Sequence, residues 1–137
     1  MDQTALVEAS VRDGERLVQE LDSIGVPVAA AFWFYFEEYE DWRLVIASRL
    51  VDDAKRENRP LQDAYRSVLK AFRNLSERNS DFQLDESDIH LVGLDHKLVQ
   101  GLGRMLQTGT GISHIRMRHD MVDGIFVEDA LVYRLSA

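Results

Sequence analysis

The longest apolar run of the chain, residues 26–36, constrains its fold more than any other feature. It is eleven residues long and includes Pro27, so it is too short to be one of the segments of roughly 20 residues that cross a bilayer. From Val28 to Phe36 neither face of an extended chain carries a charged group. We therefore expect a central strand whose two faces are covered by helices or by a partner chain.

This strand begins a predicted β-hairpin. The polar turn Glu37–Asp41 follows it, and a second strand is expected over Trp42–Val51. Apolar residues recur every three or four positions in three other stretches, which predicts amphipathic helices over residues 2–24, 60–75 and 95–106. We assign Asp95 as the N-cap of the last helix. Three more strands are predicted, at residues 89–94, 112–119 and 125–135.

The order of these elements predicts the fold class. Asp123–Gly124 is a favoured tight turn before the last strand, and a bulge is expected at residues 128–130. The order α-β-β-α-β-α-β-β favours an α+β fold, with a mostly antiparallel sheet of about five strands and three helices. A length of 137 residues is typical of one domain, so we expect a single domain over residues 1–137.

Charge and cysteine content narrow the functional classes. The net charge is −8, and the first 41 residues carry ten acidic side chains against Arg12 and Arg16. Such a surface repels phosphate, so we expect no general binding to nucleic acid and no membrane binding. The absence of cysteine excludes a disulfide, a thiolate metal site and a cysteine nucleophile. The acidic N-terminus lacks the features of a signal peptide, and we expect a cytoplasmic protein.

Three stretches give the chain a resemblance to a known family: Pro27–Trp33, Trp42–Ser48 and Asp123–Arg134. On these stretches the chain resembles a family of small uncharacterised bacterial proteins, and the likeness runs from the first helix to the C-terminus. Family members tend to have proline where Arg49 or Leu50 falls, and Gly-Pro where this chain has Asn58–Pro60. The connection after the hairpin is therefore expected to differ. The resemblance implies the fold and no particular activity.

Four candidate metal ligands lie close together in the sequence: Asp88, His90, Asp95 and His96. Carboxylate oxygens and imidazole nitrogens suit zinc or manganese, and the end of a strand beside the start of a helix is a common ligand position. The alternative is a helix cap, Asp95, next to surface histidines. No sequence motif typical of a cofactor site is present, and we expect no bound cofactor.

A basic stripe is predicted on one face of the strand at residues 112–119. His114, Arg116 and Arg118 lie two residues apart, so they share the solvent face while their neighbours face the core. As an anion-binding group they would contact phosphate or an acidic protein surface. The alternative is an ordinary solvated face, in which they pair across the hairpin with Glu128 or Asp129.

Six of the twelve aromatic residues lie in the two strands of the predicted hairpin, including Trp33, Tyr35 and Trp42. Packing and cross-strand pairing explain many of them, but a small domain needs only one hairpin face for its core. Helices or another copy must cover the second face, and aromatic side chains are favoured at the centres of interfaces. We interpret these three residues as partner-binding, in a homodimer or with another protein.

These patterns leave three functional hypotheses. The first is a non-enzymatic, protein-binding accessory protein that self-associates through the aromatic hairpin. The second is a metal-dependent hydrolase, or another enzyme acting on an anionic substrate, built on the candidate metal ligands. The third is a protein that contacts nucleic acid through the basic stripe. Because the sequence contains no recognisable catalytic arrangement, we favour the first.

Overall fold

The protein, described by a computed structural model over residues 6–136, folds around a five-stranded sheet. Strands β1 (Ala30–Phe36) and β2 (Asp41–Ala47) form the predicted hairpin. The strand order is β3-β2-β1-β5-β4, which places β1 in the middle and β3 (Ile89–Val92) at one edge. β3 runs parallel to β2, and the other three pairings are antiparallel. The predicted α+β fold with a mostly antiparallel sheet is confirmed.

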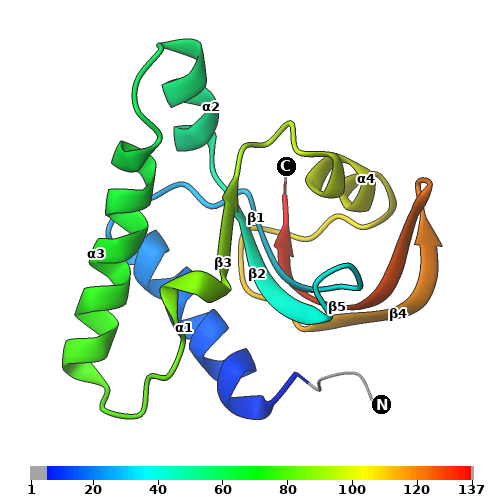
Figure 1. Ribbon diagram of the computed structural model, residues 1–137, viewed down its shortest axis with the longest axis horizontal. Coiled ribbons are helices and arrows are strands. Elements are labelled where there is room, and N and C mark those ends of the chain that lie inside the picture. The colour runs from blue at the N-terminus through cyan, green and yellow to red at the C-terminus, as the bar shows by residue number, and fades with distance from the viewer. Residues whose placement is uncertain (1–5, 137) are drawn as a thin grey trace.

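Helices cover both faces of this sheet (Figure 1). On one face lie α1 (Glu8–Ser23) and α3 (Gln62–Arg78), whose apolar sides pack on the strands. On the other face lies α4 (Lys97–Met105), enclosed by the long curved hairpin of β4 and β5. The bounds of that hairpin are Ile115–Val122 and Ile125–Leu135.

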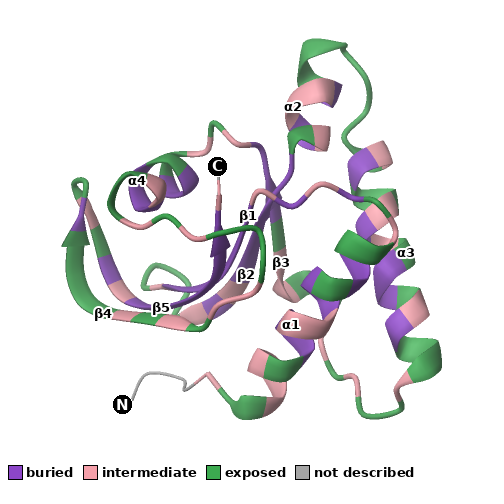
Figure 2. Cartoon of the chain, turned by 180° about the vertical axis from the view of Figure 1, so that it is seen from behind, coloured by how far each residue is buried: buried purple, intermediate pink, exposed green. Residues whose placement is uncertain are grey.

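Alternate residues of β1 enter the two halves of the core. Trp33 and Tyr35 pack among α1 and α3, while Phe32 and Phe34 pack beneath α4. Every residue from Ala30 to Tyr35 is buried, and Figure 2 shows burial concentrated in the central strands. The sequence allowed this strand to be covered by helices of the chain or by a partner chain. Within residues 6–136, the chain's own elements cover both of its faces.

Residues 6–136 contain four α-helices, one more than predicted. Strand β2 ends at Ala47, because the Ser48 hydroxyl then accepts a hydrogen bond from the N–H of Leu50 (3.2 Å) and caps α2 (Arg49–Arg56). The predicted strand Trp42–Val51 is therefore too long. A serine at the N-cap and buried Val51 and Ala54 three residues apart were the signal for this helix. A short 3-10 turn, η1 (Glu86–Asp88), also precedes β3.

Helix α4 departs from the prediction at its first residue. Its N-cap is His96, whose Nδ1 accepts a hydrogen bond from the N–H of Leu98 (3.2 Å), so the assignment of Asp95 as the cap is wrong. A Cβ atom at Gly101 would lie 2.5 Å from Cδ1 of Ile125. That glycine costs helix stability, but it allows α4 to lie close against the hairpin.

The β4–β5 hairpin has the predicted turn. Asp123 and Gly124 both have positive φ angles, of 49° and 79°, as a type I′ turn requires. Strand β5 continues through residues 128–130, where the sequence predicts a bulge. The pairing irregularity of this strand lies elsewhere, opposite Ala31 and Phe32 of β1.

Candidate functional site

The aromatic side chains expected to bind a partner lie in the core. Trp33, Tyr35 and Trp42 are only 2%, 7% and 5% exposed. The Trp33 indole donates to the hydroxyl of Tyr133 (3.0 Å), and the rings of Tyr35 and Trp42 pack edge to face at 5.6 Å. This corrects the interpretation of the hairpin, because α1, α3 and the neighbouring strands fill the face that was expected to need a partner.

The basic stripe beside β4 is neutralised by the chain's own acids. His114 Nε2 lies 2.6 Å from a carboxylate oxygen of Glu15. Arg116 donates two hydrogen bonds to Asp129 (2.6 and 2.7 Å), and Arg118 lies 3.5 Å from the same carboxylate. The Arg116 guanidinium also lies 5.7 Å from the centre of the Trp42 ring. The pairing across the hairpin with Asp129, one of the two alternatives, is confirmed, which leaves little charge on this face for an anionic ligand.

The four candidate metal ligands do not come together as a set. Asp88 accepts a hydrogen bond from the N–H of Asp85 (3.0 Å) in a capping box, and the His96 ring caps α4. His90 and His96 are neighbours, with ring centres 5.8 Å apart, and Asp95 lines the same hollow. Within residues 6–136, no group of three or more histidine, aspartate or glutamate side chains is placed to hold a metal ion.

The outer side of β3 carries the features of a binding surface. β3 ends the sheet, so one of its sides has no neighbouring strand. The N–H of Ser48 donates to the C=O of Val92 (3.0 Å), which shows that Val92 faces β2. Because the peptide groups of successive strand residues point to opposite sides, the N–H and C=O of Leu91 are directed to the outer side.

An apolar hollow lies on one side of this edge. Its volume is about 340 Å³, and its walls come from α3 and from the segment at residues 86–89. Tyr65 stands in it with 41% of its surface exposed, and Leu61, one helical turn earlier, is 42% exposed. The apolar lining is Tyr65, Val68, Leu69, Phe72 and Ile89. We call this space the apolar hollow.

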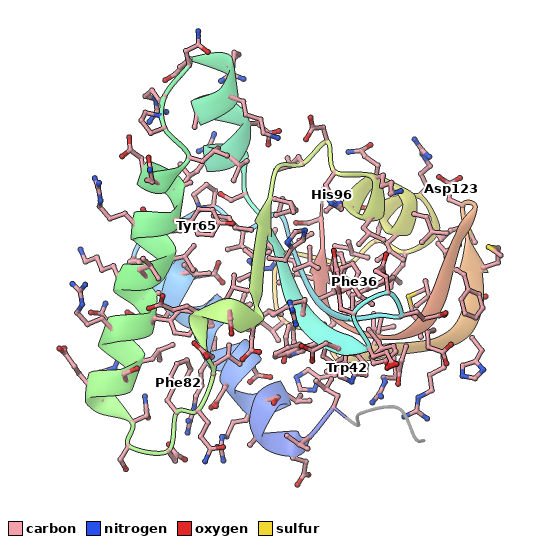
Figure 3. The ribbon with its side chains drawn as sticks, in the orientation of Figure 1. Phe36, Trp42, Tyr65, Phe82, His96 and Asp123 are labelled. Carbon is pink, nitrogen blue, oxygen red and sulfur yellow. The ribbon has the colours of Figure 1, made fainter. Side chains whose placement is uncertain are left out.

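Two further hollows meet at His90. The first, of about 470 Å³, runs along the edge itself and is lined by β3, by Leu61, by Val51 and Lys55 of α2, and by His96. The second, of about 220 Å³, is lined by Phe36, Tyr39, Arg43 and His90. Together they form what we call the His90 cleft. In Figure 3, Tyr65 lies on one side of β3, and Phe36 and His96 lie on the other.

The electrostatics of the His90 cleft keep its imidazoles neutral. Partial burial lowers the pKa of His90, and the nearby charge of Arg43 lowers it further. Burial likewise lowers the pKa of His96, with smaller contributions from His90, Lys97 and Lys55, while Asp95 opposes them. A histidine surrounded mainly by cations loses its proton more readily. The cleft therefore combines neutral imidazoles with Lys55, Asp95 and the Arg43–Asp41 ion pair.

The sequence identified this site only in part. It singled out His90, Asp95 and His96, which line the same hollow, but grouped them with Asp88, which belongs to the capping box of η1. It did not single out Lys55, Arg43 or Tyr65. The periodicity of residues 60–75 places Leu61 and Tyr65 on the apolar stripe of that helix, whereas the structure leaves them 42% and 41% exposed, so the spacing contained no signal for the apolar hollow.

Comparisons with models of known families, with curated proteins and with solved structures found no match to this chain. The family resemblance therefore stays a prediction. No helix within residues 6–136 is long and apolar enough to span a membrane.

Proposed function

We propose that the protein is a non-enzymatic protein-binding module that holds an extended segment of another protein along the outer side of β3. We call the apolar hollow and the His90 cleft together the β3 surface. The single observation that carries the proposal is that hollows lie on both sides of the open edge of β3, whose other edge pairs with β2. This is the arrangement needed to bind a strand, since its alternate side chains project to opposite sides.

The backbone and the exposed side chains support this mode of binding. An added strand would find the outward N–H and C=O of Leu91 available for sheet pairing. One set of its side chains would cover Tyr65 and Leu61, which are large apolar residues exposed to solvent. Burying apolar surface at roughly 25 cal/mol per Å² makes such a site favourable for a large apolar side chain of the partner.

The proposal keeps the functional class favoured from the sequence and moves the binding surface. The hairpin residues Trp33, Tyr35 and Trp42 lie in the core, whereas Leu61 and Tyr65 are accessible. Protein-binding surfaces are marked by exposed apolar patches with polar rims. Lys55 and Asp95 supply such a rim at the cleft.

Selection from a phage-displayed library of twelve-residue peptides tests the proposal. Three proteins are used as bait: the wild type, Leu61→Glu/Tyr65→Glu, and the matched control Met121→Glu/Phe126→Glu. The control replaces apolar residues that are 63% and 46% exposed on the β4–β5 hairpin. We expect the wild type and the control to enrich the same peptides, each with a large apolar residue, and the β3-surface variant to enrich none of them.

Two outcomes would contradict the proposal. If all three proteins enriched the same peptides, binding would lie elsewhere on the molecule. If the wild type enriched no peptide, the β3 surface would not hold an extended segment. Light scattering measures whether a second copy of the chain occupies the surface instead. If the wild type were a dimer that Leu61→Glu/Tyr65→Glu dissociates, and no peptide were enriched, the β3 surface would be assigned to a second copy of the chain.

A further inference from the structure

We infer that the His90 cleft binds a carboxylate, so that the segment held by the β3 surface carries an acidic side chain beside its apolar anchor. This inference rests on the proposed function and adds a chemical requirement to it. Its basis is the placement of cations, hydrogen-bond donors and aromatic walls around one space. The apolar hollow lies next to this space, on the other side of β3.

Two lysines without an ion pair among the described residues lie at or near the cleft in an acidic protein. Lys55 lines the cleft, and Lys97 lies close enough to influence His96. Neither lysine has an ion pair within residues 6–136, since the salt bridges of that range involve other basic side chains. Asp95 lines the same hollow and opposes the lysines at His96, and the Asp52 carboxylate, which accepts a hydrogen bond from the N–H of Leu94, lies beside Gly93. In a chain of net charge −8, lysines that no carboxylate of the described range pairs with are the groups at this cleft that favour an anionic ligand.

Arg43 contributes donors and a fixed position. Its guanidinium bonds to Asp41 and to the C=O of Trp42, and it lies 5.7 Å from the centre of the Tyr39 ring. Because one carboxylate already compensates its charge, Arg43 acts here mainly as a hydrogen-bond donor. A guanidinium has five N–H groups, so donors remain for a second acceptor.

The two imidazoles differ in what they can offer the ligand. Because Nδ1 of His96 accepts a hydrogen bond from the N–H of Leu98, the neutral ring carries its proton on Nε2 and is a donor without being charged. His90 has ring contacts to Phe36 and His96. It is therefore the ring that can gain a proton without breaking a helix cap.

Aromatic side chains form part of the wall of the His90 cleft. Phe36 and Tyr39 pack at 5.7 Å and form one side of the hollow around His90. Tyr39 is 63% exposed and His90 is exposed as well, so the site is open to solvent, and its charge-assisted hydrogen bonds are still stronger than neutral ones. A carboxylate there would favour the charged form of His90, so binding raises its pKa and tightens as the pH falls below about 6.5.

A pair of synthetic peptides tests the inference. Each is a capped nonapeptide of alternating threonine and leucine, with glutamate or glutamine at the centre. We expect the glutamate form to bind roughly five-fold more tightly than the glutamine form at pH 6.5, and Lys55→Gln to remove most of that difference. Arg118→Gln is the matched control, since it removes a cation already paired with Asp129, and it should leave the preference unchanged.

The outcomes separate this inference from the proposed function. Equal binding of both peptides, lost in Leu61→Glu/Tyr65→Glu, would overturn the carboxylate requirement and leave strand binding intact. No binding of either peptide would overturn both. Free acetate gives a third arm: if acetate shifts the imidazole signals of His90 while neither peptide binds, the cleft takes small acids and the inference about a protein segment is wrong.

Discussion

Both edges of the sheet carry histidines and basic side chains, but the two edges differ in how these side chains are paired with carboxylates. At the β4 edge, His114, His119 and two arginines each lie within 3.5 Å of a carboxylate from Glu15, Glu128 or Asp129. At the β3 edge, His90 and His96 lie among cations, and Lys55 has no acidic partner within the described residues. The first edge pairs its own charges, and we propose that the second uses Lys55 to hold a ligand.

This difference separates charges that stabilise the fold from charges available for binding. A paired charge contributes to folding and must lose its partner before it can hold a ligand. An unpaired, half-buried donor contributes little to folding and can bind at once. On sequence alone the two sets looked alike, since each combined histidines with nearby charges.

Removing an acid should have unequal effects at the two edges, and this is the largest difference that we expect. Asp129 is 8% exposed and holds two arginines. Because Arg116 is about one-third exposed, water partly screens its ion pair with Asp129. Asp129→Asn should therefore lower the free energy of unfolding by about 1–2 kcal/mol. Asp95→Asn should change it by less than about 0.5 kcal/mol. Urea denaturation measures both, and equal losses would break the comparison.

The pH dependence of stability gives a smaller effect at the β3 edge. A histidine whose pKa is lowered in the folded state takes up its proton first in the unfolded chain, so its contribution is complete above about pH 6.5 and is lost as the pH falls. His90 is such a residue. His90→Gln should therefore lose less stability than the wild type between pH 7 and 5.5. Denaturation curves at both pH values measure this, and equal losses of stability in His90→Gln and in the wild type would contradict it.

The smallest effect should follow from changing the apolar residues of the β3 surface. Tyr65→Glu alters a side chain that is 41% exposed, so the free energy of unfolding should change by no more than about 0.5 kcal/mol. Phe126→Glu, at 46% exposure on the β4–β5 hairpin, is the matched control. A large loss for Tyr65→Glu alone would mean that this side chain stabilises the fold and is not reserved for a partner.

The sequence predicted the sheet well because strand patterns are local. The apolar run of residues 26–36 became the central strand, and Asp123–Gly124 became the predicted turn. It did not reveal α2, because Ser48 ends a strand and starts a helix without any connecting residues. One face of a helix or strand can be recognised from spacing, but whether that face is covered depends on distant elements. That is why Trp33 was mistaken for a surface residue.

The binding site was harder to predict for the same reason. His90 and Phe36 lie 54 positions apart, and their ring contact of 6.2 Å exists only because β3 pairs with β2. The pairing of Arg116 with Asp129 depends likewise on the register of β4 and β5. Which charges remain unpaired is a property of the fold, so the sequence could supply candidates and could not rank them.

A titration that resolves all four imidazoles most directly tests whether the two edges differ in this way. The glutamate peptide is added to labelled protein at pH 6.5, and the ring signals are followed by NMR. The expected result is that the signals of His90 shift in the direction of protonation and those of His96 shift without protonation, while those of His114 and His119 stay in place. Shifts confined to His114 and His119, or equal shifts of all four rings, would refute the assignment of the β3 surface as the binding site.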